Sequence, residues 1–230
     1  MDKKVITPIG FIKTDFKEKF GIPRQSGRSP SSIGEVVFYK PFSSPDAFRE
    51  ITAFSHLWII FDFSLCSSDK FTPLVRPPRL GGNAKVGVFA SRSPFRPNNI
   101  GLSCVKLEKV NYLEDGVTLT VSGVDLLDGT PIYDVKPYIP LADCKLDAVG
   151  GYSDKFVDYK LSVVYDEKVL QIIPKEKRQA LLECLSDDPR PSYQDDDRVY
   201  GMKFDHFNVK FSVKDGVLNI ITVEKDKSSL

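Results

Sequence analysis

Histidine and cysteine are scarce in this chain of 230 residues, which contains two histidines and four cysteines. The cysteines are isolated and form no C-x-x-C pair, so we expect neither a zinc site nor another metal site. They are Cys66, Cys104, Cys144 and Cys184. His56, inside an apolar stretch, is interpreted as a core residue whose ring nitrogens are hydrogen-bonded. His206 is interpreted as a structural residue. Unpaired thiols in a chain without an apolar N-terminal segment are typical of a cytoplasmic protein.

Long hydrophobic runs are also missing. The longest is Leu57–Phe61, which is too short to cross a bilayer, so no contact with a membrane is expected. Two nucleotide-binding patterns are absent as well: no G-x-G-x-x-G follows an expected strand, and G-x-x-x-x-G-K-[ST] does not occur. These absences argue against a Rossmann dinucleotide site and a P-loop. Hydrophobic residues make up 41% of the chain, which is enough for a substantial core.

Acidic residues are absent from residues 70–107, although the whole chain is nearly neutral, with 32 basic and 31 acidic residues. The basic residues of this window are Lys70, Arg76, Arg79, Lys85, Arg92, Arg96 and Lys106. Proline, glycine, asparagine and serine are frequent there, which predicts loops. Arginine-rich loops without carboxylates suit a large anion such as a nucleic-acid backbone. A solvated basic face would have the same composition, so composition alone leaves both interpretations open.

Short runs of apolar and β-branched residues dominate the first 140 residues. We expect strands over residues 5–12, 34–39, 55–63, 85–89, 102–112, 117–123 and 132–139. Glu114-Asp115-Gly116 predicts a hairpin turn between two of them. A short helix is expected from Ser44 to about Ile51. Short strands at this spacing predict a closed or half-closed β-barrel.

The composition changes after residue 141, where a linker with two adjacent glycines precedes an expected β-α-β-β-β unit. Its helix is expected to begin at Pro174 and to end before Pro189. An exposed acidic loop is predicted over residues 187–198. This unit could complete the barrel, but we favour a separate small domain. We therefore predict a mostly β protein with an N-terminal single-sheeted β-barrel domain (1–145) and a smaller C-terminal α+β domain (155–230).

One stretch near the end of the expected barrel mixes charged and apolar residues. Asp128-Gly129-Thr130 is expected to form a turn with a carboxylate, a hydroxyl and a glycine that permits close approach. Asp134, Lys136 and Tyr138 alternate along a strand, so their side chains leave it on one face. A solvated strand face also explains this pattern. Carboxylates among apolar neighbours, such as Asp125, are nevertheless expected to have perturbed pKa values, which are a feature of functional sites.

Five motifs occur in order along the first 140 residues. They are PRQ at 23–25, AFSHLWIIF at 53–61, RPPRLGGN at 76–83, VGVFASRSPFRPN at 86–98 and LLDGTPIYDVKPYIP at 126–140. Together they resemble the TsaA-like family, whose bacterial members are tRNA methyltransferases. The resemblance implies a β-barrel that binds S-adenosyl-L-methionine, often at the interface of a homodimer. It also implies N6-methylation of threonylcarbamoyl-adenosine (t6A) at position 37 of the tRNA anticodon loop, which forms m6t6A.

Carried over residue by residue, the resemblance assigns contacts with the methyl donor. The positions are Pro23, Arg24, Gln25, Ser64, Leu65, Arg92, Leu102, Leu127, Asp128, Gly129 and Thr130. Relatives have a His-Gln pair where this chain has Ser64-Leu65, so backbone contacts are expected there. Relatives tend to have Asn-Pro where this chain has Asn98-Asn99, which predicts a looser turn.

Methylation of the ureido nitrogen of t6A requires in-line placement and removal of a proton. Asp134 is our candidate general base, with Lys136 and Tyr138 orienting it or the carbamoyl oxygen. Asp128 competes as the base or as a contact of the donor. Cations expected to hold the tRNA are Arg76, Arg79, Lys85 and Arg96. Two other hypotheses remain: a non-catalytic RNA-binding barrel, and a methyltransferase of the same fold that acts on another substrate.

Overall fold

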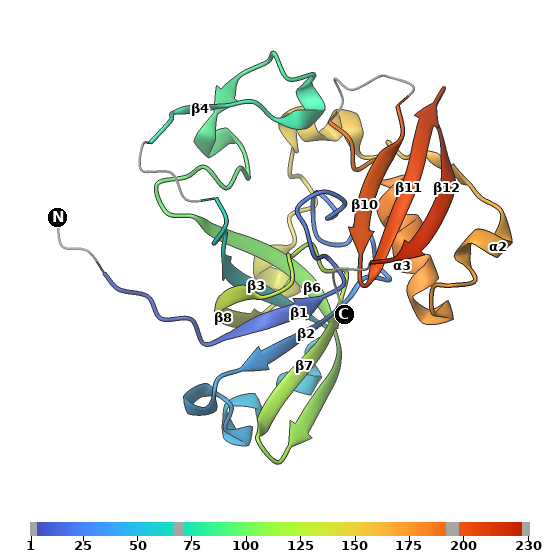
Figure 1. The fold of residues 1–230 in the computed structure, drawn as a ribbon. Helices are drawn as coiled ribbons and strands as arrows, with labels where there is room; N and C mark the ends of the chain where they lie inside the picture. Colours follow the sequence, from blue (N-terminus) through green and yellow to red (C-terminus); the bar gives the residue numbers. More distant parts are fainter. Residues whose placement is uncertain (1–3, 67–70, 192–197, 227–230) are drawn as a thin grey trace.

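The computed structural model describes residues 4–66, 71–191 and 198–226. Its N-terminal part is a closed antiparallel barrel with the strand order β1-β2-β7-β6-β3-β8. The barrel strands are β1 (Gly10–Thr14), β2 (Ile33–Phe38), β3 (His56–Asp62), β6 (Ile100–Leu113), β7 (Gly116–Ser122) and β8 (Thr130–Pro137). Figure 1 shows the barrel below the C-terminal sheet and the green loops that contain β4. The barrel predicted from the sequence is confirmed.

Aliphatic side chains fill the barrel and alternate with outward-facing residues along each strand. The most deeply buried of them are Ile12, Val36, Leu57, Ile59, Leu119, Val121 and Ile132. In β3, Leu57 and Ile59 point inward, whereas His56 is exposed. The prediction of a core histidine was therefore wrong, because a barrel strand has one face on the outside even when that face is largely apolar.

Two N-terminal elements differ from their prediction. β1 begins later than expected, at Gly10, because Pro8 has no N–H to donate to a neighbouring strand. The expected helix is instead two 3-10 helices, Pro45–Phe48 and Ile51–Ala53. Glu50, between them, has a φ of 65°, a left-handed conformation that interrupts helical hydrogen bonding.

The basic segment contains little regular structure, as its composition predicts. β4 (Leu74–Val75) pairs with β5 (Val86–Gly87), so the strand expected over residues 85–89 is reduced to two residues. A 3-10 helix, Val88–Ala90, follows β5. Lys70 lies outside the described residues.

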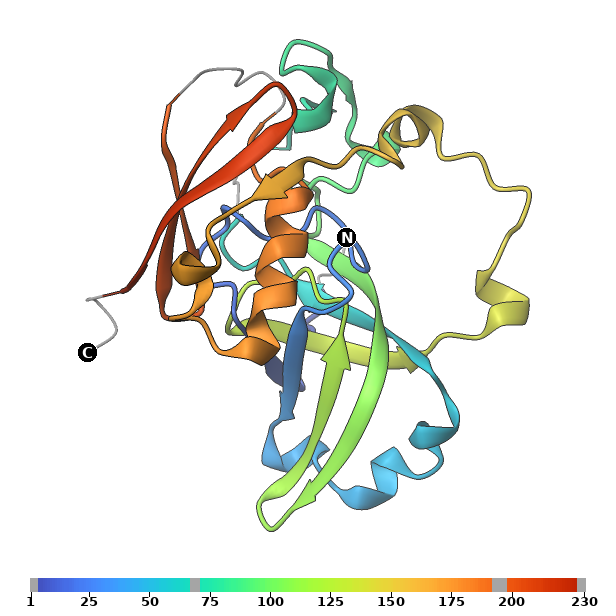
Figure 2. The same cartoon turned by 90° about the vertical axis from the view of Figure 1, so that its right-hand side faces the viewer.

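The C-terminal part is a four-stranded sheet with the order β10-β11-β12-β9, in which β9 and β12 are parallel. Its strands are β9 (Ser162–Val164), β10 (Tyr200–Phe204), β11 (Phe207–Lys214) and β12 (Val217–Lys225). The α-helices are α1 (Pro140–Asp143), α2 (Glu167–Leu170) and α3 (Lys175–Ser186). Figure 2 shows α3 running alongside the sheet. A C-terminal part with both sheet and helix was predicted and is confirmed.

The barrel and the C-terminal part share one hydrophobic core. The rings of Phe16 and Phe204 lie 6.2 Å apart, centroid to centroid. Lys177 of α3 adds a polar link, since its Nζ lies 2.7 Å from both Asp15 Oδ1 and Asp205 Oδ2. The two parts are therefore joined by apolar and ionic contacts. Within the described ranges, no helix is long and apolar enough to span a membrane.

The segment after α3 differs from the exposed acidic loop that was predicted. Asp187, Asp188 and Arg190 are buried, because their charged groups bind one another and residues of the barrel side. Residues 192–197, in the second half of the predicted loop, lie outside the described residues.

Candidate active site

The outward face shared by β8, β3 and β6, called the β3 outer face below, collects several of the predicted site residues. The strand register places Asp134 beside Ile60, and Ile60 beside Leu102. The β3–β8 pairing is irregular at this point, because Tyr133 is an extra residue between the paired residues Ile132 and Asp134. Such a β-bulge turns Asp134 outward although Ile132, two residues earlier, faces the core.

Asp134 and Lys136 form an ion pair on this face, with 2.8 Å between Lys136 Nζ and Asp134 Oδ2. The backbone N–H of Val135 donates to Asp134 Oδ1 over 2.9 Å. The side chains of Asp134 and Lys136 are 44% and 60% exposed, so water screens their attraction. The carboxylate is oriented and remains open to an incoming group.

Tyr138 lies just beyond β8 and packs against aromatic residues of β3. Its ring centroid is 5.8 Å from that of Trp58 and 6.3 Å from that of His56. Trp58 Nε1 donates to Asp143 Oδ2 over 3.1 Å, which holds α1 beside the β3 outer face. In the described part of the chain no hydrogen bond joins Tyr138 to Asp134, so this predicted trio is only partly assembled.

Two segments assigned to the methyl donor by resemblance meet at the rim of the barrel. Arg92 Nη1 donates to Gln25 Oε1 over 2.7 Å. The next residue, Ser26, accepts a hydrogen bond at its Oγ from the backbone N–H of Cys104 over 3.3 Å. β7 pairs with β6 only from Lys106 onward, so the remaining edge of β6 is available to this loop.

Asp125 lies at the same rim and was not among the predicted site residues. Its Oδ1 accepts a hydrogen bond from Ser103 Oγ over 2.5 Å, and the backbone of Ser26 also binds the carboxylate. Burial of the carboxyl group raises its pKa to about 6, although these hydrogen bonds and the positive charge of Arg92 oppose the rise. The sequence feature that pointed to a perturbed pKa was a carboxylate between two apolar residues, Val124 and Leu126.

The turn at residues 127–130 is held mainly by the chain itself. Asp128 Oδ1 accepts from the backbone N–H of Thr14 over 2.9 Å, and Lys17 Nζ lies 2.9 Å from Asp128 Oδ2. Gly129 has a φ of 77° and donates from its N–H to the carbonyl of Ile12. Thr130 Oγ1 donates within the turn. The two oxygens of Asp128 thus bind the end of β1 and the residues after it, whereas, among the described residues, those of Asp134 bind only residues of its own strand.

The residues after β3 are open to solvent at the end of the strand. Leu65 is 62% exposed, and its carbonyl accepts from Lys19 Nζ over 2.7 Å. Asn99 Nδ2 donates to the carbonyls of Cys66 and Pro94 over 2.8 and 2.9 Å. The Asn99 amide thus bridges two segments, a contact that a proline cannot make, whereas the prediction that this turn is looser than in relatives stays a prediction.

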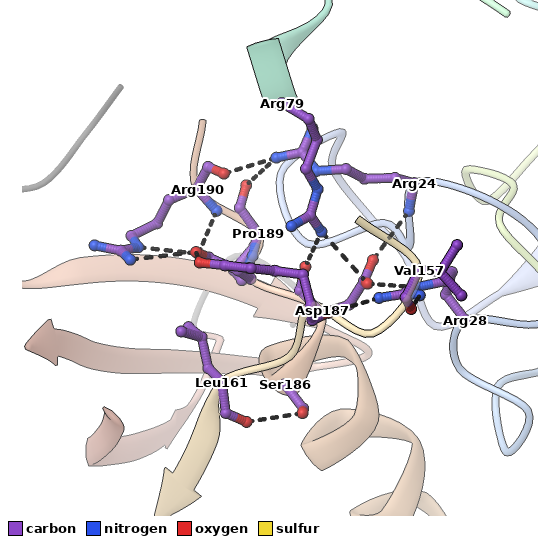
Figure 3. Close-up of polar contacts among 11 residues, drawn as sticks. Arg24, Arg28, Arg79, Val157, Leu161, Ser186, Asp187, Pro189 and Arg190 are labelled. Carbon is purple, nitrogen blue, oxygen red and sulfur yellow. Dashed lines mark hydrogen bonds and ion pairs between the residues drawn. The ribbon is translucent and has the colours of Figure 1, made fainter. Parts of the chain in front are cut away.

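Arg24 points toward the C-terminal part. Its Nη2 donates to the carbonyl of Arg190 over 2.7 Å (Figure 3). Its Nε is buried and has no hydrogen-bond partner among the described residues. Burial and, next, the positive charge of Arg79 lower its pKa. A buried donor without a partner, close to a second cation, is suited to an anionic group such as a carboxylate.

The four cations assigned to tRNA differ in their surroundings. Arg76 and Lys85 are exposed. Arg96 Nη1 donates to the carbonyls of its own loop, and its guanidinium lies 5.6 Å from the ring centroid of Phe89. Arg79 Nη2 donates to the carbonyl of Asp187 over 2.6 Å. The first two are available to a polyanion, whereas the other two also order loops. No group of three potential metal ligands is found among the described residues.

The closed antiparallel barrel is the fold expected for the TsaA-like class, whose five motifs the first 140 residues carry. The chain belongs to the tRNA-methyltransferase O family within that class. The sequence model of this family's N-terminal domain matches residues 11–144, and that of its C-terminal domain matches residues 158–226.

Individual relatives match along nearly the whole chain. A tRNA (adenine(37)-N6)-methyltransferase of Escherichia coli strain K12 is 41% identical over 225 residues, which cover 94% of this chain and 96% of that protein. A putative S-adenosylmethionine-dependent methyltransferase, RcsF, of Pseudomonas aeruginosa is 41% identical over 207 residues, covering 86% and 87%. The crystal structure of TrmO from P. aeruginosa gives a TM-score of 0.79 at 31% identity and covers 98% of each chain.

Proposed function

We propose that this chain is an S-adenosylmethionine-dependent tRNA (adenine(37)-N6)-methyltransferase that converts t6A into m6t6A. The observation that carries the proposal is the strand register, which sets Leu102 and Asp134 on either side of Ile60 on one outward face. Leu102 is a methyl-donor residue by resemblance, and Asp134 is the candidate base. The E. coli relative, whose name states adenine-37 N6-methylation, supports the proposal along 94% of the chain.

The rim of the barrel fits the methyl donor. S-adenosylmethionine supplies an electrophilic methyl group on a sulfonium and also carries a carboxylate. Arg24 offers that carboxylate its unpartnered Nε, while Gln25 and Arg92 hold their two segments together. The exposed side chain of Leu102 offers an apolar surface. The other donor contacts assigned by resemblance stay proposals of the same kind; at Ser64, Leu65 and residues 127–130 they are made by the backbone.

Asp134 acts as the general base in this proposal. The lone pair of the target nitrogen is delocalised into adenine and the carbamoyl carbonyl, so its proton must leave as the new N–C bond forms. Lys136 binds the carbamoyl oxygen of the substrate, which releases the Asp134 carboxylate from its ion pair, and Tyr138 borders the same face. In-line positioning contributes up to ~7–11 kcal/mol to lowering the barrier, and the base a further ~10²–10⁴-fold in rate.

The basic loops hold the tRNA. Arg76, Lys85 and Arg96 lie in a stretch of sequence without a carboxylate, so they attract the phosphates of the anticodon loop. Arginine also suits the threonine carboxylate of t6A because it can bind both oxygens. A tRNA substrate places the enzyme in the cytoplasm.

Two features of assembly belong to the proposal. Exposed apolar side chains surround the β3 outer face, among them Leu65, Leu102 and Ile139, and a homodimer formed over this region would cover them. Residues 1–145 and 155–230 act as two domains joined by the shared core. Analytical ultracentrifugation tests the first point: a single species at the mass of one chain across micromolar concentrations would contradict the dimer.

Nucleoside mass spectrometry provides the decisive test of the function. Transfer RNA that carries t6A is incubated with the protein and S-adenosylmethionine bearing a labelled methyl group, then digested. We expect labelled m6t6A, and no label in tRNA that lacks t6A. Isothermal titration distinguishes the alternatives. A non-catalytic RNA binder gives no heat with S-adenosylmethionine, whereas a methyltransferase with another substrate binds the donor but leaves t6A unchanged.

A further inference from the structure

The corner between α3 and β10, residues Asp187–Arg190 and called the α3 corner below, is buried although it is rich in charge. Asp187 is 2% exposed and caps the C-terminus of α3. Asp188, with a φ of 53°, accepts hydrogen bonds from Tyr159 Oη and from the guanidinium of Arg190. The corner is thus a rigid set of acceptors: two carboxylates and the carbonyls at the end of a helix.

Three arginines from the barrel side bind this corner (Figure 3). Arg28 Nε donates to Asp187 Oδ1 over 2.7 Å, and its other nitrogens donate to the carbonyls of Val157 and Tyr159. Arg79 donates to the carbonyl of Asp187, with its guanidinium 4.7 Å from the ring centroid of Tyr159. Arg24 donates to the carbonyl of Arg190. The partial negative charge at the end of α3 favours these cations.

These arginines come from the two segments that the proposed function uses. Arg24 and Arg28 enclose the loop of Gln25, which binds Arg92 at the methyl-donor site. Arg79 lies in the basic segment, at the 3-10 helix Pro78–Leu80. The buried carboxylate of Asp187 contacts both segments, since Arg28 Nε is 2.7 Å and Arg79 Nη2 is 3.5 Å from its Oδ1. The α3 corner therefore sets the distance between residues 23–28, called the donor loop below, and the loop between β4 and β5, residues 76–85, called the basic loop below.

We propose that Asp187 is a positioning residue for the methyl transfer: through Arg28 and Arg79 it holds the donor loop, residues 23–28, and the basic loop in register with each other. This inference rests on the proposed function and gives the C-terminal part a role in it. Arg79 then serves to orient the basic loop rather than to bind phosphate. Asp187 acts through other residues and touches neither the donor nor the target base.

The test compares Asp187→Asn with Lys177→Met in the full-length protein. Lys177→Met is the control because Lys177 is also an ion-paired residue that joins α3 to the barrel side. Lys177 lies at the other end of α3, away from the donor loop. Titration calorimetry measures the dissociation constant for S-adenosylmethionine, and hydrogen exchange follows the amides of residues 23–28. We expect Asp187→Asn to weaken donor binding at least tenfold and to speed exchange in the loop, with less than a twofold change in both for Lys177→Met.

Equal effects of the two substitutions would overturn the inference, since they would indicate a merely structural role. The inference would also be overturned if Asp187→Asn left both the hydrogen exchange of residues 23–28 and the affinity for S-adenosylmethionine unchanged. If that variant fails to fold, Arg28→Lys replaces it, because a lysine keeps the charge but cannot bond Asp187, Val157 and Tyr159 together. If the wild-type protein releases no heat with S-adenosylmethionine, the proposed function itself is refuted. If the wild-type protein binds S-adenosylmethionine and Asp187→Asn binds it equally well, only the role of Asp187 is refuted.

Discussion

Two ion-paired carboxylates of this molecule face opposite environments. Asp134 on the β3 outer face is 44% exposed at its side chain and bound to one exposed ammonium, that of Lys136. The side chain of Asp187 in the α3 corner is 3% exposed and bound to guanidinium groups from two loops. The first pair can separate when a substrate arrives, because water solvates either partner. The second cannot separate without leaving a charge buried, so it acts as structure.

The largest expected effect comes from removing the buried carboxylate. Asp187→Ala leaves the guanidinium groups of Arg28 and Arg79 without their buried carboxylate partner, and we expect a loss of about 3–5 kcal/mol in the free energy of unfolding. Asp134→Ala, its exposed counterpart, should change the free energy of unfolding by less than about 0.5 kcal/mol. Urea denaturation followed by circular dichroism measures both values. Similar losses would remove the distinction between the two sites.

Asp134, whose replacement should hardly change stability, should have a large effect on turnover when it is replaced by asparagine. We expect methyl transfer to fall by about 10²–10⁴-fold, because an amide cannot accept the proton, while the affinity for S-adenosylmethionine stays nearly constant. Single-turnover assays and calorimetry give the two quantities. Asp115→Asn, in the exposed turn between β6 and β7, is the matched control and should leave both unchanged. Loss of donor affinity in Asp134→Asn would show that the carboxylate binds the donor instead.

Asp125 is a third carboxylate, at the rim of the barrel. Its pKa of about 6 predicts that the stability of the protein depends on pH. The unfolded chain releases this proton near pH 4, whereas the folded protein retains it until about pH 6. The contribution of this group to stability is thus fully present below about pH 4 and is lost as the pH rises through 6. The loss amounts to about 1–3 kcal/mol at neutral pH.

Asp125→Asn removes that dependence. Relative to the wild type, the variant should gain stability between pH 4.5 and pH 7.5, provided that the Asn carbonyl still accepts the bond from Ser103. Urea midpoints at the two pH values give the comparison. A constant difference between the two proteins would contradict the raised pKa.

The smallest expected effect concerns the exposed cations. Arg76→Ala and Lys85→Ala should each lower the slope of log affinity for tRNA against log salt by about 0.7–0.9. Lys210→Ala, exposed on the C-terminal sheet, serves as the control. Filter-binding titrations between about 50 and about 500 mM salt, one decade in concentration, resolve such a change. A slope that responds equally to Lys210→Ala would indicate diffuse attraction rather than contact by these loops.

The sequence contains enough information for the local elements and the fold class, and much less for the site. Short runs of apolar and β-branched residues predicted β2, β3, β6 and β7, because such runs are typical of strands with a buried face. They could not predict the β-bulge at Tyr133, which depends on pairing with β3. Nor could they predict that Arg79 and Arg24 are bound by the α3 corner, since those contacts join residues that are distant along the chain. Charge had marked Arg79 as a candidate for binding tRNA, and the family resemblance had marked Arg24 as a contact of the methyl donor.

The closing pair of the barrel, β1 with β8, joins Gly10 to Ile132. On the ribosome, β1 emerges long before its partner and must wait with unpaired backbone edges while the intervening chain is made. We expect the donor loop to become ordered later still, after Asp187 has been synthesised. A nascent chain released before that point would contain all six strands of the barrel but would lack Asp187, the residue that we propose holds residues 23–28 in place.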